Sequence, residues 1–75
     1  MKQLRIVPDG WPCTLGECGP GLFTYKNNLG FKSEYGQDGV YVVVSGEIFW
    51  GGTNTKENRL ALPVQPCKAE WWEAE

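Results

Sequence analysis

The sequence predicts a mainly β protein, a small antiparallel sheet or partly open barrel of about four or five strands with one or two short helical turns. Ten glycines and five prolines divide the 75 residues into short segments, which favours turns between strands over long helices. Hydrophobic residues make up 41% of the chain and aromatic residues 13%, more than disordered chains carry. A chain of this length is too short to bury two cores, so we expect residues 1–75 to form one domain.

The most continuous apolar stretch, residues 40–50, is rich in β-branched residues and is typical of a β-hairpin turning at Ser45-Gly46. A two-residue loop there pairs Tyr41 with Trp50 across the ladder and sorts the side chains onto two faces. One face carries Tyr41, Val43, Ile48 and Trp50, and the other carries Val40, Val42, Val44 and Phe49. Both faces are apolar, so we expect this hairpin in the middle of the sheet, either covered on both sides or keeping one side for a partner.

The N-terminal third predicts a strand followed by a turn and a short helical segment. Residues 2–7 alternate as a first strand should, and Pro8-Asp9-Gly10 ends it. Thr14 and Glu17 stand three residues apart, as in a capping box, which predicts one helical turn. We expect Trp11 to fill the core beside this turn, with an exposed aromatic contact as the alternative.

A second hairpin is predicted from residues 22–26 and 31–35 around the loop Asn27-Asn28-Leu29-Gly30, where Asn and Gly tolerate a tight reversal. This hairpin holds the aromatic and basic residues that could stack bases and follow phosphates in a single-stranded nucleic acid. The candidate contacts are Tyr25, Lys26, Phe31, Lys32 and Tyr35. A net charge of −2 argues against an electrostatic nucleic-acid binder, so this function is the alternative.

The C-terminal third predicts a short helix and a final strand. Asn54 as N-cap and Glu57 three residues later form a second capping box, which predicts a helix to about Leu60. Residues 62–65 have the composition of a strand, but Pro63 and Pro66 each lack a backbone donor. We therefore place this strand on an edge of the sheet or outside the ladder.

Adjacent tryptophans follow near the C-terminus, among glutamates. In a strand, Trp71 and Trp72 point to opposite faces, so one of them is expected to stay exposed. An exposed Trp flanked by charge is a suitable anchor for a protein contact. The candidate protein contacts are Tyr41, Trp50, Trp71 and Trp72.

The residues needed for most catalytic sites are missing from the sequence. There is no histidine, so neither a Ser-His-Asp nor a Cys-His site can be built, and we expect no enzymatic activity and no cofactor. The three cysteines, Cys13, Cys18 and Cys67, are expected to be free thiols, because an odd count is not typical of a disulfide framework. A three-thiolate metal site and a redox bridge remain alternatives.

The sequence also predicts where the protein acts. No apolar run approaches the roughly 18–20 residues that span a bilayer, and the start of the chain lacks the apolar region of a signal peptide. We therefore expect a cytoplasmic protein with no membrane contact.

Three segments carry a resemblance to a known group of proteins: PDGWPCTLGECGPGLF at residues 8–23, LGFKSEYG at residues 29–36 and YVVVSGEIFWGGTNTKENR at residues 41–59. The chain resembles short uncharacterised accessory proteins of tailed bacteriophages and prophages. This resemblance implies a bacterial host cell as the setting. With the apolar hairpin and the tryptophan pair, it leads us to expect a non-enzymatic protein that binds a host or phage protein, or a second copy of itself, and that inhibits a bacterial defence or regulatory factor. A minor virion component is a further alternative.

Overall fold

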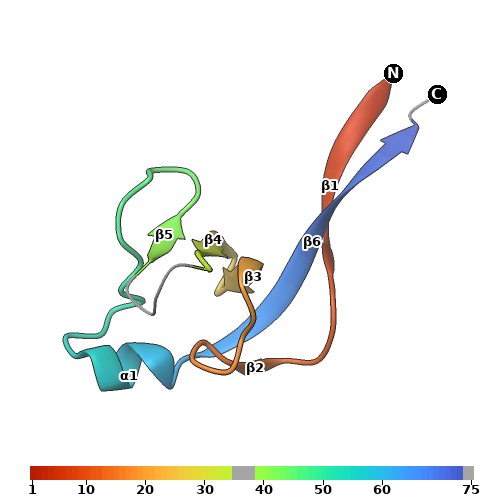
Figure 1. Cartoon of the computed structure of the whole chain (residues 1–75). Coiled ribbons are helices and arrows are strands. Elements are labelled where there is room, and N and C mark those ends of the chain that lie inside the picture. The colour runs from red at the N-terminus through yellow and green to blue at the C-terminus, as the bar shows by residue number, and fades with distance from the viewer. Residues whose placement is uncertain (35–38, 74–75) are drawn as a thin grey trace.

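The computed structural model describes residues 1–34 and 39–73, and this part of the chain forms one open, six-stranded antiparallel sheet with one short helix (Figure 1). The strands follow the order β1-β6-β3-β4-β5, and β2 pairs with the start of β6. The strands are β1 (Lys2–Pro8), β2 (Cys13–Thr14), β3 (Gly21–Tyr25), β4 (Asn28–Lys32), β5 (Val40–Val42) and β6 (Pro63–Glu73), and the helix is α1 (Lys56–Leu60). The predicted mainly β, antiparallel fold is confirmed. The sheet stays open, with β1 and β5 at its ends.

Strand β6 is the longest of these strands, with 11 residues, and it pairs with β1, β2 and β3. The prediction of a short edge strand at residues 62–65 is therefore wrong. Pro63 is the first residue of β6, a position that proline tolerates. The Pro66 carbonyl accepts a hydrogen bond from the Asp9 N–H at 2.9 Å. The N–H and C=O of one residue in an antiparallel strand point to the same side. The N–H that Pro66 lacks would therefore point toward the end of β1, so the β3–β6 ladder does not need it.

Strands β3 and β4 form the second hairpin, with a tighter loop than predicted. Tyr25 pairs with Asn28, so the loop is Lys26–Asn27 and not residues 27–30. Both loop residues have positive φ, 46° and 68°, as a two-residue type I′ turn requires. Gly30 lies opposite Phe23, and its missing side chain leaves room for the Phe23 ring.

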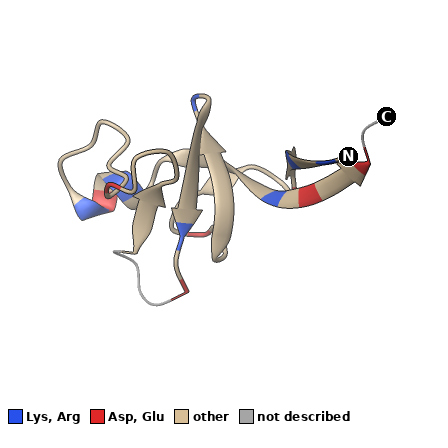
Figure 2. Ribbon diagram, turned by 90° about the horizontal axis from the view of Figure 1, so that it is seen from above, with Lys and Arg blue, Asp and Glu red and all other residues tan. Residues whose placement is uncertain are grey.

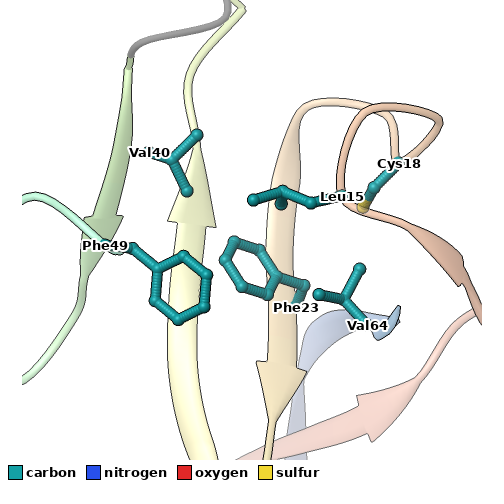
Figure 3. Packing of buried hydrophobic residues seen from close by; sticks show 6 residues of the cluster. All are labelled: Leu15, Cys18, Phe23, Val40, Phe49 and Val64. Carbon is teal, nitrogen blue, oxygen red and sulfur yellow. The ribbon is translucent and has the colours of Figure 1, made fainter. Parts of the chain in front are cut away.

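The core lies on one face of the sheet and is small (Figure 3). Its buried members are Leu15, Cys18, Phe23, Val40, Phe49 and Val64. The rings of Phe23 and Phe49 meet edge to face with centroids 5.2 Å apart, a favourable geometry for aromatic pairs. The expectation that Trp11 fills the core is wrong, because Trp11 is 88% exposed and Leu15 occupies the core instead. Leu15 is held there by its N–H, which donates to the Leu62 carbonyl at 2.8 Å.

Residues 40–50 do fold back on themselves, at the β5 end of the sheet and not in its middle as predicted. Tyr41 lies opposite Ile48, so the loop spans four residues, 43–46, in place of the predicted two. The register differs from the prediction by two residues, and an even shift leaves the paired side chains on their predicted faces. Val44, predicted on the face of Val40 and Phe49, lies instead in the exposed loop. Val40 and Phe49 accordingly face the core, whereas Tyr41 and Ile48 face away from it.

The two predicted helical turns form as short local structures. The Cys18 N–H donates to the Thr14 carbonyl at 2.9 Å, and the Thr14 hydroxyl donates to the Glu17 carboxylate at 2.8 Å. Helix α1 is capped by Thr55, whose hydroxyl accepts from the Asn58 N–H at 3.1 Å. The predicted cap, Asn54, is one residue too early. No helix among residues 1–34 and 39–73 has the length and apolar character needed to cross a bilayer.

The first predicted strand is confirmed as β1. Together with the C-terminal half of β6 it forms a two-stranded ribbon that extends away from the rest of the sheet (Figure 1). We call this ribbon, residues 2–8 and 67–73, the arm. The N-terminus and the C-terminal end of β6 lie at its tip (Figure 1). The arm makes the molecule elongated, with extents of 46 × 26 × 24 Å.

Candidate protein-binding surface

The face of the sheet opposite the core carries a row of apolar side chains that crosses three strands. Leu22 on β3 pairs with Phe31 on β4, Phe31 pairs with Tyr41 on β5, and Tyr41 pairs with Ile48. Residues directly opposite each other in a ladder share a face, so these four side chains form one surface, which we call the outer face. Phe31 is 44% exposed, Tyr41 40% and Ile48 51%. The row is therefore open to solvent and offers aromatic and aliphatic contacts.

The edges of the outer face are held by backbone contacts. Val43, which begins the loop after β5, donates its N–H to the Leu29 carbonyl of β4 at 3.0 Å. Its exposed side chain extends the apolar row. A shallow hollow of ≈ 360 Å³ lies beside Phe31. Its other lining residues are Pro20, Gly21, Lys32, Ser33 and Glu34. The row thus has a polar rim on one side, which is typical of protein-binding patches.

Beneath the outer face, Lys32 fastens β4 to the turn that follows β2. Lys32 is buried, and its ammonium donates to the carbonyls of Leu15 at 2.7 Å, Gly16 at 3.3 Å and Cys18 at 2.5 Å. All three ammonium protons have protein acceptors, so this charge is not available to a phosphate. The interpretation of Lys32 as a nucleic-acid contact is therefore wrong.

The remaining nucleic-acid candidates do not form one surface either. Tyr25 points to the core side, where its ring meets Phe49 edge to face at 5.7 Å. Phe31 lies on the opposite face of the sheet, and Lys26 lies in the β3–β4 turn with its ammonium 5.3 Å from the Tyr25 ring. Tyr35 lies outside the described residues. The Tyr25 and Phe31 rings cannot stack neighbouring bases, because the sheet separates them.

The four predicted protein contacts lie at three separate places. Tyr41 belongs to the outer face. Trp50 lies against the guanidinium of Arg59, 4.7 Å from the ring centroid, next to α1. Trp71 and Trp72 lie in the arm on opposite faces, as predicted, because they pair with Leu4 and Gln3 respectively.

Three outer-face residues, Leu22, Phe31 and Ile48, were missed as part of one protein contact with Tyr41. Phe31 was assigned to the nucleic-acid alternative, and Ile48 was placed on the correct hairpin face but was not named as a contact. Their proximity depends on the β4–β5 register, which joins strands separated by seven residues in the sequence and is therefore not set by a two-residue turn. The alternation within residues 40–50 was the one sequence signal that pointed to this face.

Cys18 belongs to the core and Cys13 packs against it, whereas Cys67 pairs with Leu22 on the opposite face of the sheet. All three are free thiols. Burial raises the pKa of the Cys18 thiol above its ordinary value, and the neighbouring Cys13 thiol adds to the rise, while the Lys32 ammonium opposes it. Cys18 therefore stays protonated near neutral pH and packs as an apolar side chain. Within residues 1–34 and 39–73, no cluster of three or more Cys, Asp or Glu side chains is placed to hold a metal ion.

In comparisons with protein-family models, curated proteins and solved structures, nothing matches this chain.

Proposed function

We propose that this protein is a non-enzymatic accessory protein that binds another protein through the outer face. The observation that carries the proposal is the exposed row of Phe31, Tyr41 and Ile48 across neighbouring strands. Aromatic side chains clustered at the centre of a patch are the usual anchors of protein interfaces. Contiguous apolar surface of this kind on a small domain marks an interaction site.

The energy available from these anchors sets the scale of the interaction. Full burial of a Phe or Tyr side chain removes about 200 Å² from water, so covering the exposed parts of Phe31 and Tyr41 buries about 170 Å². At about 25 cal/mol per Å² this amounts to about 4 kcal/mol. Association costs at least about that much in lost freedom, so a stable complex must also cover the rim, including Val43 and the hollow beside Phe31.

The resemblance to accessory proteins of tailed phages predicts that the partner is a host or phage protein. A small protein that masks a surface of a larger one acts by occupying that surface, which requires no chemistry. Inhibition of a bacterial defence or regulatory factor is the function we propose for such a complex.

Affinity capture from a lysate of a bacterial host tests this proposal, using the wild-type chain and two variants. Tyr41→Ser removes the central aromatic ring, and Val44→Ser changes a more exposed loop residue outside the row. We expect the wild type and Val44→Ser to recover the same protein, and Tyr41→Ser to recover at least about tenfold less. Matching thermal unfolding curves would show that both variants are folded. Recovery of no specific partner by the wild type, or equal recovery by all three proteins, would refute the proposal.

A further inference from the structure

The arm lacks the support that the rest of the sheet has. Strand β1 pairs with β6 from Lys2↔Glu73 to Pro8↔Cys67, whereas β3 pairs with β6 only over residues 65–67. Among the described residues, β1 is thus the one strand that borders β6 from residue 68 to residue 73. A two-stranded ribbon alone in water is marginally stable. The arm therefore gains most from a surface that covers it.

One face of the arm is apolar and the other is polar. Because side chains alternate along a strand, Leu4, Ile6, Ala69 and Trp71 share one face, which we call the arm face. Leu4 is 53% exposed, Ile6 39% and Trp71 70%. The opposite face has its own contacts, with Arg5 stacked over the Trp72 ring at 4.9 Å and Lys68 paired with Glu70 at 3.1 Å. The arm face is the side that a partner would cover.

We propose that a second copy of this chain covers the arm face, so that two arms stack face to face around a two-fold axis near Ile6 and Ala69. The size of the side chains changes along the arm face in a way that fits this arrangement. The large pair Leu4↔Trp71 lies toward the tip and the smaller pair Pro8↔Cys67 lies at the base. A two-fold axis at Ile6↔Ala69 brings each large tip over the small base of the other copy, and the same patch then serves both partners.

The charges at the tip favour a copy over a strongly charged partner. Lys2 and Glu73 lie opposite each other at the tip, and the N-terminal ammonium lies 3.7 Å from the Glu73 carboxylate. Figure 2 shows both acidic and basic residues on the arm. Lys2 and Glu73 share the arm face, whereas Arg5, Lys68 and Glu70 lie on the opposite face. A surface that carries both signs does not repel its own copy.

The area of the arm face predicts a weak dimer. The exposed parts of Trp71, Leu4 and Ile6 amount to about 300 Å² per copy. With the neighbouring Pro8, Ala69 and Cys67 and the aliphatic stems at the tip, the total is about 1,000 Å² for two copies, which is the lower limit of a specific interface. An interface at this lower limit is typical of weak complexes, so we expect a dissociation constant in the micromolar range. Cys67 at the base of the arm pairs with Leu22 of the outer face, so the two faces adjoin on one side of the sheet. Trp71 lies in the arm and Tyr41 lies on β5 at the other end of the sheet, so variants of these two residues let this proposal and the proposed function fail separately.

Sedimentation equilibrium of the full chain in a reducing buffer, from about 1 to 200 µM, tests the proposal. The adjacent tryptophans supply a matched pair of variants, since Trp71→Ser alters the arm face and Trp72→Ser alters the opposite face of the same strand. We expect a monomer–dimer equilibrium for the wild type, a dissociation constant at least about tenfold higher for Trp71→Ser, and a change below about threefold for Trp72→Ser. A wild type that stays monomeric throughout, an oligomer other than a dimer, or equal effects of the two variants would overturn the proposal.

A charge-exchange experiment excludes misfolding as the cause of any loss. Ala69 lies close to the proposed axis, so Ala69→Glu and Ala69→Lys each place like charges against their own copies, and we expect each variant alone to be monomeric. An equimolar mixture places Glu against Lys, and we expect the dimer to return. Failure of the mixture to dimerise while both variants keep wild-type unfolding curves would contradict the two-fold arrangement.

Discussion

Replacing Lys32 should lower the free energy of unfolding of this small fold, because the ammonium group makes buried polar contacts. Its ammonium lies in the core side of the sheet and donates to three carbonyls of residues 15–18. Replacing it with methionine keeps the length and the apolar stem of the side chain but removes the charge and the donors. Lys32→Met therefore tests whether this buried lysine fastens the turn after β2 to β4.

The expected loss of stability follows from the geometry. Two of the three hydrogen bonds are short, at 2.5 and 2.7 Å, and a bond with a charged partner contributes about 1.5–3 kcal/mol. Their loss costs about 3–6 kcal/mol in total. Relief from burying an ammonium returns part of that amount. We expect a net loss of about 3 kcal/mol in the free energy of unfolding, which for a domain of this size lowers the melting temperature by about 12–24 °C.

Urea unfolding followed by tryptophan fluorescence measures this change, with Lys26→Met as the matched control. Lys26 is exposed in the β3–β4 turn, so its replacement should alter the free energy of unfolding by less than about 0.5 kcal/mol. If the two variants are equally stable, the reasoning about Lys32 is refuted.

Four further outcomes are expected. Gly30→Ala places a methyl group within 2.7–2.8 Å of the Phe23 Cε2 and Cε1 atoms and should cost about 3 kcal/mol in urea unfolding, whereas Gly19→Ala, with open space around it, should cost less than about 0.5 kcal/mol. Thr55→Ala removes the cap of α1 and should cost about 1 kcal/mol, which Thr55→Ser restores in thermal unfolding. The Cys18 thiol, whose pKa burial raises, should react with a disulfide reagent at least about tenfold more slowly than Cys13 and Cys67. Because folding favours the protonated Cys18 thiol, its contribution to the free energy of unfolding is fully present below the ordinary thiol pKa. This contribution should be lost as the pH rises through the raised pKa of the folded protein. A free energy of unfolding that does not change over that pH range would contradict the prediction.

Local patterns in the sequence predicted the fold class and the division of residues 40–50 between two faces. The alternation within residues 40–50 placed Tyr41 and Ile48 on one side and Val40 and Phe49 on the other, and the structure keeps this division despite a longer loop. Alternation has a period of two, so it is insensitive to a two-residue error in the turn. This is why the division of the side chains between two faces was predicted correctly while the register was not, and why the choice of the exposed face stayed open.

Features that depend on distant segments could not be predicted in this way. The prolines of β6 suit a central strand because Pro66 faces the end of β1, and that position depends on how far β1 extends. The burial of Lys32 depends on carbonyls in a turn about 16 residues away along the chain, a contact that no local pattern encodes. Trp11 was expected inside because of its size, but Leu15 reaches the core from the turn after β2 and leaves Trp11 in solvent.

The most direct test of the outer face as a binding surface is site-specific photocrosslinking in a bacterial host. A benzophenone analogue of phenylalanine at position 31 replaces an exposed aromatic side chain with a similar one, and the same analogue at position 44 serves as the control in the loop outside the row. We predict that irradiation joins the position-31 protein to one larger protein, and that the position-44 protein forms this adduct weakly or not at all. The absence of any adduct at position 31, or the same adduct from both positions, would contradict binding through the outer face.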